Sequence, residues 1–180
     1  GHGGRVMIER AYREHQQELL EDEHDRLFSM FIDHYNLNIP GKSRPYPGVA
    51  EALARFEKAG YLLAVCTNKH EAPSKALLAA LGLDRHFAAI CGQDTFAFRK
   101  PDPRHLIETI RLAGGDPHQA LMVGDSQTDI DTAKAAGIPV VADDFGYTDR
   151  HVREFEPTKI ISHFDELTVE LAERLIAAAH

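Results

Sequence analysis

From residue 44 onward, short apolar runs alternate with longer amphipathic stretches. The runs are typical of strands covered on both faces, and the amphipathic stretches are typical of helices that pack one side against a core. The pattern predicts strands at residues 61–66, 87–91, 120–123, 139–142 and, at an edge, 160–161. It predicts helices at residues 49–59, 72–81, 105–113, 129–137 and 165–179. Because strands and helices alternate, the chain is predicted to form a parallel sheet with crossover helices.

The first 43 residues follow a different pattern. Residues 5–36 are rich in charge and have apolar positions spaced as on helices, among them Phe28, Phe31 and Ile32. Residues 40–45, Pro-Gly-Lys-Ser-Arg-Pro, are turn formers and suit a hinge. We therefore predict a partial α-helical cap at residues 1–43 and an α/β core, a Rossmann-like parallel sheet with flanking helices, at residues 44–180.

Composition agrees with a folded enzyme in the cytoplasm. Of the 180 residues, 43% are hydrophobic and 27% charged, so disorder is not expected. The net charge of −8 argues against nucleic acid or anionic membranes as partners, and a phosphorylated substrate would need local cations. No apolar run reaches the length of a membrane span, and no signal peptide is evident. Cys66 and Cys91 lie in apolar runs and are expected to be buried, unreactive thiols.

The strand predicted at residues 61–66 ends in Thr67 and Asn68, a hydroxyl and an amide. Such a side chain at a strand-to-helix turn, together with backbone N–H groups, can bind phosphate oxygens. The same two residues could equally cap the following helix. The segment alone does not decide between these two interpretations.

Lys100 is followed by Pro101-Asp102-Pro103, and the prolines restrict the backbone around it. An isolated lysine is usually a solvated surface group. A lysine held in a restricted loop is a better candidate for a fixed ammonium, which could neutralise the charge of a phosphoryl group and of neighbouring carboxylates.

A third polar segment, Gly124-Asp125-Ser126-Gln127-Thr128-Asp129, joins a buried strand to a helix. Ligands of open parallel sheets bind at the carboxyl ends of strands, and carboxylates placed there can hold Mg²⁺. Asp129 could also act only as an anion at the N-terminus of the helix. Asp143-Asp144 follows the next predicted strand and is interpreted as a turn.

Taken together and in this order, the three segments resemble the second, third and fourth motifs of the haloacid dehalogenase-like hydrolases. The resemblance covers essentially the whole chain. Within the superfamily it is strongest to the phosphoglycolate phosphatase family, through Thr67-Asn68-Lys69, Arg99 to Pro103, Gly124-Asp125-Ser126 and Phe145-Gly146-Tyr147. The helical segment before residue 44 is similar to the small α-helical cap of that group.

The resemblance implies a Mg²⁺-dependent phosphatase that acts on a small phosphorylated metabolite, with phosphoglycolate as the first candidate. It implies that Thr67 and Asn68 bind the phosphoryl oxygens and that Lys100 orients the group and neutralises its charge. Asp125 would bind Mg²⁺. Ser126 and Asp129 would have supporting roles, Asp129 toward the metal site or Lys100.

One motif of the family is missing. These hydrolases begin with a strand that ends in Asp-x-Asp, whose first carboxylate attacks phosphorus and whose second is the general acid and base. The only Asp-x-Asp of this chain is Asp129-Ile130-Asp131, inside the fourth motif. We therefore expect a longer natural protein, and no phosphatase turnover from these 180 residues alone. We also expect a gap in the middle of the sheet, between the strands that end at Thr67 and Asp125.

Other functions remain open at this point. The same core could serve a phosphatase or phosphomutase acting on a sugar phosphate. A catalytically silent form could retain only the phosphate and Mg²⁺ pocket. Receiver-type signalling domains also carry Asp, Thr and Lys at strand ends, but they have no helical cap, and Lys100-Pro101-Asp102-Pro103 with the paired acids suits a hydrolase better.

Overall fold

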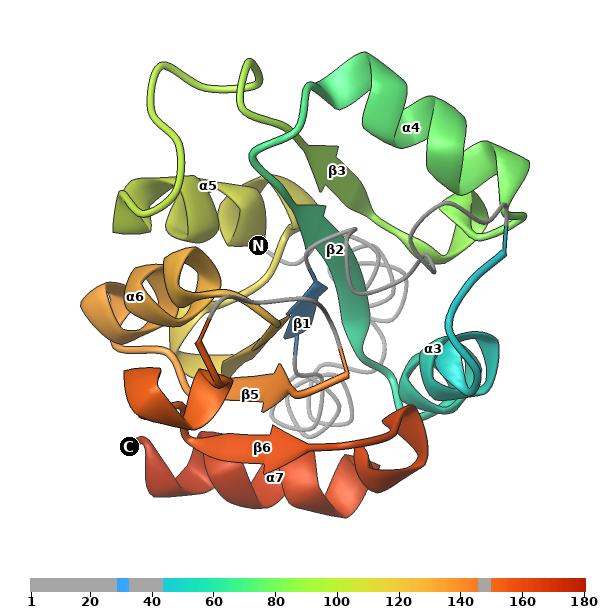
Figure 1. Cartoon of the computed structure of the whole chain (residues 1–180). Helices are drawn as coiled ribbons and strands as arrows, with labels where there is room; N and C mark the ends of the chain where they lie inside the picture. The colour runs from blue at the N-terminus through green and yellow to red at the C-terminus, as the bar shows by residue number, and fades with distance from the viewer. Residues whose placement is uncertain (1–28, 33–43, 146–149) are drawn as a thin grey trace, which may run out of the picture.

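A computed structural model describes residues 29–32, 44–145 and 150–180 (Figure 1). Within these ranges the strands form one parallel sheet in the order β3-β2-β1-β4-β5-β6. The strands are, in chain order, β1 Ser29–Ile32, β2 Leu62–Cys66, β3 Ala89–Cys91, β4 Ala120–Gly124, β5 Val140–Asp143 and β6 Lys159–Ile161. The α/β class predicted from the strand and helix alternation is confirmed.

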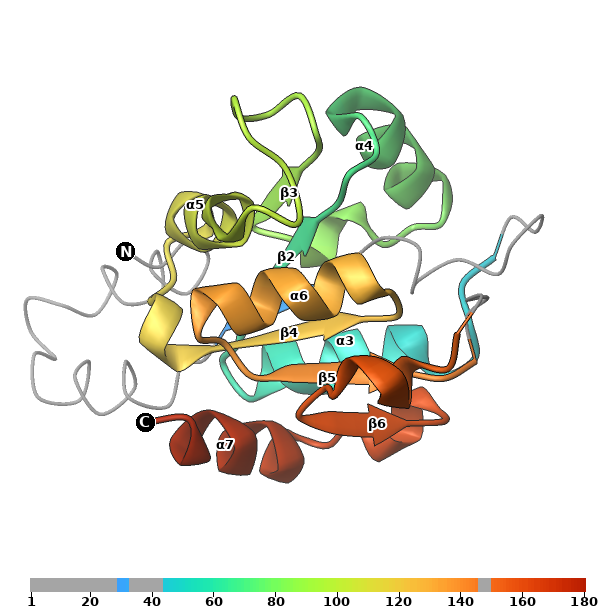
Figure 2. The same ribbon diagram turned by 60° about the vertical axis from the view of Figure 1, so that its left-hand side comes forward.

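Helices cover both faces of the sheet (Figures 1 and 2). They are α3 Val49–Lys58, α4 Glu71–Ala80, α5 Pro103–Ala113, α6 Gln127–Ala136 and α7 Val169–Ala178. One hydrophobic core contains side chains of α3, α4 and α7, and the other contains side chains of α5 and α6. The sheet thus lies between two helical layers, as expected for parallel strands.

The strands β2 and β4, which lie on either side of β1, are buried along their whole length. Their side chains alternate between the two cores, because successive residues of a strand point to opposite faces. In β2, Leu63 and Val65 belong to the core of α3 and α7, whereas Ala64 and Cys66 belong to the core of α5 and α6. A strand that is covered on both faces needs apolar residues at every position, and both β2 and β4 have them.

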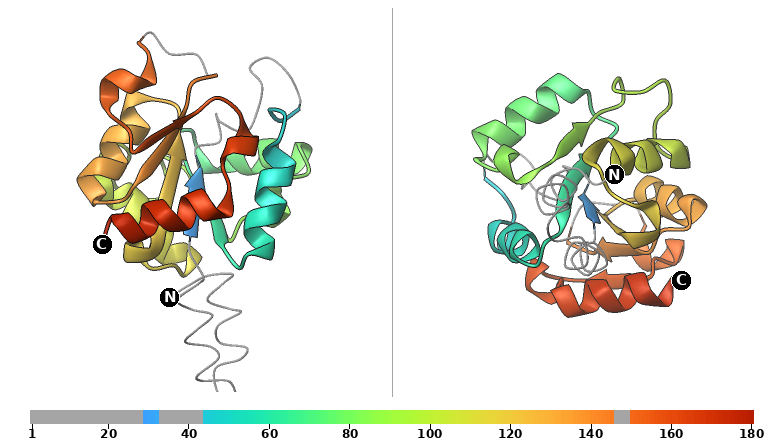
Figure 3. Two further views of the ribbon diagram at one scale, coloured as in Figure 1. Left: turned by 90° about the horizontal axis from the view of Figure 1, so that it is seen from below. Right: turned by 180° about the vertical axis from the view of Figure 1, so that it is seen from behind.

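β1 corrects one sequence-based prediction. Ser29–Ile32 was assigned to the helical cap, but it forms the strand between β2 and β4, with Ile32 paired to Val65 on one side and Val123 on the other. Figure 3 shows β1, in blue, inside the molecule. A gap between two buried strands leaves two rows of N–H and C=O groups to be paired, and this apolar segment pairs them. The rest of the predicted cap lies outside the described residues.

The other predicted elements agree with the structure to within a few residues at their ends. The largest difference is at the C-terminus, where the helix predicted to start at residue 165 is a short 3-10 turn, Phe164–Glu166, followed by α7. Asp143 is a second correction: it is the last residue of β5 and is buried, not part of a turn. Among the described residues, no helix has the length and apolarity required to cross a membrane.

Candidate active site

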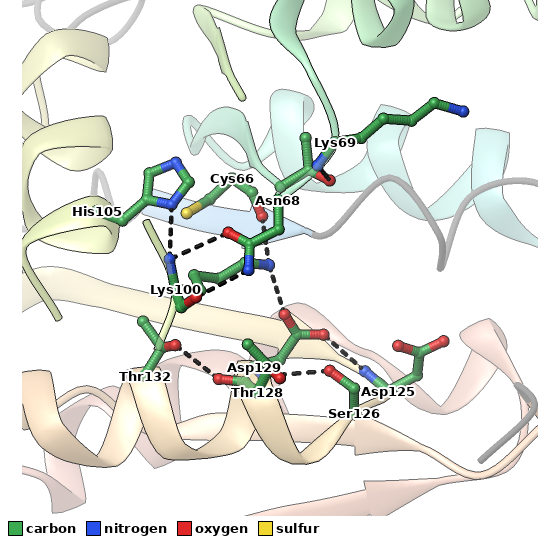
Figure 4. A network of polar contacts seen from close by, with 11 residues as sticks. Cys66, Asn68, Lys69, Lys100, His105, Asp125, Ser126, Thr128, Asp129 and Thr132 are labelled. Atoms are coloured by element: carbon green, nitrogen blue, oxygen red, sulfur yellow. Dashed lines mark hydrogen bonds and ion pairs between the residues drawn. The ribbon is translucent and has the colours of Figure 1, made fainter. Parts of the chain in front are cut away.

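Three connections meet at the carboxyl edge of the sheet, at the ends of β2, β3 and β4 (Figure 4). They are the loop from β2 to α4, the long loop from β3 to α5 and the turn from β4 to α6. The structure brings together at this edge all the site residues that were predicted from the sequence: Thr67, Asn68, Lys100, Asp125, Ser126 and Asp129. Their common location is the one expected for a ligand site in a parallel sheet.

Lys100 connects the three segments. Lys100 is only 3% exposed. Its Nζ donates hydrogen bonds to Asp129 Oδ1 at 2.6 Å and to the carbonyl oxygen of Cys66 at 2.8 Å. An ammonium is not stable in such a place without a counter-charge, and the buried carboxylate of Asp129 supplies it. The lysine is therefore a fixed, desolvated cation and not a solvated surface group.

The side chain of Asn68 makes hydrogen bonds to both backbone groups of Lys100. Its Nδ2 donates to the Lys100 carbonyl oxygen at 2.8 Å, and its Oδ1 accepts from the Lys100 N–H at 3.0 Å. The side chain of Asn68 therefore positions Lys100. Sequence reasoning had placed this residue on the phosphate and had no signal for the backbone contact, which depends on the distance between two loops.

Thr67 is fully buried at the end of β2, and its N–H donates to the carbonyl oxygen of Cys91 at 3.0 Å. Its hydroxyl oxygen accepts from the N–H of Lys69 at 3.1 Å. The alternative that Thr67 and Asn68 cap α4 is wrong, because the N-cap residue of that helix is His70, whose own side chain makes no capping hydrogen bond. Thr67 thus orders the turn between β2 and α4, which contains Lys69.

The turn after β4 is shaped by Asp129. Its Oδ2 accepts from the N–H of Asp125 at 3.2 Å, and its own N–H donates to the hydroxyl of Ser126, the N-cap residue of α6. Gly124 makes this approach possible, since a Cβ at that position would lie 2.4 Å from the Cβ of Asp129. Asp129 therefore joins the lysine to the turn that carries Asp125.

The loops after β2 and β3 are tied directly to each other. The N–H of Gln93 donates to the carbonyl oxygen of Lys69 at 3.0 Å, and the N–H of Glu71 donates to Asp94 Oδ1 at 2.8 Å. The Thr95 hydroxyl also donates to the carboxylate of Glu71. Together with Asn68 these bonds fix the distance between Thr67 and Lys100.

Asp125 is the residue that could hold a metal ion. Figure 4 shows its carboxylate pointing away from α6. No group of three metal-binding side chains occurs among the described residues. Mg²⁺ commonly binds through one or two carboxylates and completes its shell with water and substrate phosphate oxygens, so one aspartate at this edge fits a magnesium site.

Asp143 is a buried acid near the site that the sequence analysis assigned to a turn. It ends β5 one residue after Ala142, which pairs with Gly124, and Asp125 directly follows Gly124, so the two acids lie at the same end of adjacent strands. Burial raises the pKa of Tyr46, and the negative charges of Asp143 and then Asp125 raise it further. The available signal was the apolar run before Asp143, which resembles the run before Asp125.

Known proteins place the chain in a family. The model of the haloacid dehalogenase-like hydrolases matches residues 3–142. A phosphoglycolate phosphatase of Mesorhizobium japonicum is 81% identical over 179 residues, which are 99% of this chain and 79% of that protein.

Solved structures agree with this assignment. A predicted phosphoglycolate phosphatase from Haemophilus somnus is 35% identical with a TM-score of 0.66, over 69% of this chain and 56% of that one. CbbY from Rhodobacter sphaeroides in complex with phosphate is 27% identical with a TM-score of 0.65, over 73% and 60%. This chain therefore spans less than two thirds of either solved chain. The chain belongs to the haloacid dehalogenase-like hydrolases. Its relatives in that family include phosphoric monoester hydrolases.

Proposed function

We propose that this site binds the phosphoryl group of a small phosphorylated metabolite, and that the natural protein hydrolyses phosphoglycolate in the cytoplasm with Mg²⁺. The observation that carries the proposal is the buried ammonium of Lys100, bonded to the carbonyl oxygen of Cys66 just before Thr67, at the carboxyl edge of a parallel sheet. A fixed cation in a dry site stabilises phosphoryl charge far more strongly than a solvated one. The choice of phosphoglycolate rests on the 81% identical relative, which is a phosphoglycolate phosphatase.

In this proposal each residue has a separate task. The hydroxyl of Thr67 and the backbone N–H of Asn68 bind phosphoryl oxygens, and Lys100 neutralises their charge. Asp125 holds Mg²⁺, which when bound would neutralise further charge on the phosphoryl group. Asp129 keeps Lys100 protonated and in place, and Ser126 fixes the turn through its hydrogen bond to Asp129.

Attack on phosphorus needs a carboxylate that the matched motifs do not supply. The family uses the first Asp of Asp-x-Asp as nucleophile, and the only such sequence here begins at Asp129, whose carboxylate is bonded to Lys100. We therefore propose that these 180 residues bind phosphate and Mg²⁺ but do not turn over a phosphate ester.

Two assays test the proposal. Calorimetric titration with inorganic phosphate, with and without Mg²⁺, should detect binding to the chain and its loss in Lys100→Met. The 180-residue chain, whose identity is checked by an intact mass of 20.1 kDa, should not hydrolyse phosphoglycolate. The Mesorhizobium relative should hydrolyse it. A panel of sugar phosphates tests the alternative substrates. Failure of the chain to bind phosphate would refute the binding proposal, and turnover by the chain would refute its inactivity.

A further inference from the structure

His105 lies directly behind Lys100 and has no part in the motifs identified from the sequence. It is the third residue of α5 and is fully buried. Its Nδ1 lies 3.1 Å from the backbone nitrogen of Lys100 (Figure 4). The Lys100 N–H is therefore shared between two acceptors, His105 Nδ1 and Asn68 Oδ1 at 3.0 Å.

The direction of this hydrogen bond fixes the state of the imidazole. A backbone N–H can only donate, so Nδ1 must be the acceptor and cannot carry a proton. The ring is then neutral, with its proton on Nε2. A protonated Nδ1 would face the Lys100 N–H donor to donor, so this arrangement selects one tautomer of His105.

The ring is held in place by the loop that leads to Lys100. Phe96 packs edge-on against His105 with 5.9 Å between ring centroids, and Phe96 stacks on Phe98 at 5.5 Å. The guanidinium of Arg104 lies over Phe98, 4.6 Å from the ring centroid. His105 therefore contacts both the aromatic part of the loop and the lysine at its end.

We propose that His105 is a positioning residue for Lys100. By accepting from the Lys100 N–H, it sets the point from which the lysine side chain starts, and so the place of the ammonium between Cys66 O and Asp129. Asn68 and His105 approach the same N–H from different elements, the β2–α4 loop and α5. This inference rests on the proposed phosphate site, because the cation that it positions is the one assigned to the phosphoryl group.

Three variants separate positioning from stability. His105→Leu removes the acceptor and keeps an apolar side chain in the core. His105→Asn offers an amide oxygen near the position of Nδ1 and serves as the conservative rescue. Thr109→Val is the matched control, since Thr109 is fully buried on the same helix and its hydroxyl donates to the His105 carbonyl oxygen at 2.7 Å.

The first readout is the dissociation constant for inorganic phosphate, measured with Mg²⁺ by calorimetry. His105→Leu should weaken binding about fivefold to tenfold, the size expected for one buried hydrogen bond. His105→Asn should recover most of this loss. Thr109→Val should lower the melting temperature without changing phosphate affinity. If His105→Leu and Thr109→Val change the affinity equally, or if His105→Asn behaves like His105→Leu, the positioning role is refuted.

A second readout does not depend on phosphate. The rate at which an amine-acylating reagent labels Lys100 can be followed by peptide mass spectrometry, with the exposed Lys75 as internal reference. Labelling of Lys100 should be faster in His105→Leu than in the parent, His105→Asn and Thr109→Val. A parent chain that fails to bind phosphate would refute the proposed function, whereas equal labelling of Lys100 in all variants would overturn the role of His105.

Discussion

Lys100 and Asp129 form an ion pair that is almost completely excluded from water. Nζ lies 2.6 Å from Oδ1, and the two side chains are 1% and 0% exposed. The pair joins a residue of the β3–α5 loop to the first turn of α6, so the geometry of the site and the stability of the core depend on the same contact.

Asp129→Asn should destabilise the protein by about 3–5 kcal/mol, because it leaves the Lys100 ammonium buried without a counter-charge. Urea unfolding followed by circular dichroism measures this loss. Glu108→Gln is the control, since Glu108 pairs with Arg111 at 2.6 Å on the surface and should contribute about 0.5 kcal/mol or less. The double variant Lys100→Met/Asp129→Leu should recover part of the stability. Equal effects of Asp129→Asn and Glu108→Gln would contradict the burial of the pair.

Gly124→Ala should destabilise the protein by about 1–3 kcal/mol and weaken phosphate binding, because the added Cβ would lie 2.4 Å from the Cβ of Asp129. Gly82→Ala is the control. A Cβ there meets nothing within 4 Å, but the positive φ of 72° is unfavourable for alanine and costs about 1–2 kcal/mol. The two variants should therefore differ in phosphate affinity, measured by calorimetry. Unchanged affinity in Gly124→Ala would show that the turn adapts.

Asp125→Asn should reduce the affinity for Mg²⁺ at least about tenfold, since it removes the carboxylate assigned to the metal. Asp131→Asn removes the same charge from an exposed position of α6 and should leave the affinity nearly unchanged. Calorimetric titration with MgCl₂, at fixed phosphate concentration, compares the two. The assignment of Asp125 fails if both variants lose affinity to the same extent.

Stability should fall at alkaline pH because of two buried acids. Burial raises the pKa of the Cys91 thiol from 9.0 to about 11, and burial also raises the pKa of Tyr61. The unfolded chain releases these protons at lower pH than the folded chain, so between pH 9 and 11 the unfolded state binds fewer protons. Their contribution is therefore complete below about pH 9 and is lost as the pH rises.

Urea midpoints at intervals from pH 8 to pH 11 measure this loss. The double variant Cys91→Ala/Tyr61→Phe removes both groups, and its midpoint should change less with pH than that of the parent. The absolute stability of the variant is lower for packing reasons, so only the slopes are compared. Parallel slopes would contradict the raised pKa values.

Most of the fold from residue 44 onward could be predicted because the local pattern is strong. Apolar runs such as Ala120–Val123 have a single interpretation when helices with glycine stops flank them. β1 could not be predicted in the same way. A short apolar run fits a strand or a helix turn, and here its pairing with β2 and β4 decides the outcome.

The candidate site was predicted as a group but not in its internal contacts. Thr67, Lys100 and Asp125 were found because each follows or lies near a strand end. The bond of Asn68 to the backbone of Lys100, and that of His105 to the same N–H, join residues 32 and 5 positions apart whose spacing has no sequence signature. Such contacts depend on how the loops pack, which the order of residues does not reveal.

The ties between the loops after β2 and β3 also affect how these segments exchange hydrogen with solvent. The amides of Glu71, Gln93 and Lys100 lie in or next to connections, yet each donates to an acceptor in another segment. An amide exchanges only when its hydrogen bond opens, so these three should exchange together and slowly. The connections around the proposed phosphate site would then share the protection of the sheet, and the site would need little ordering when a ligand arrives.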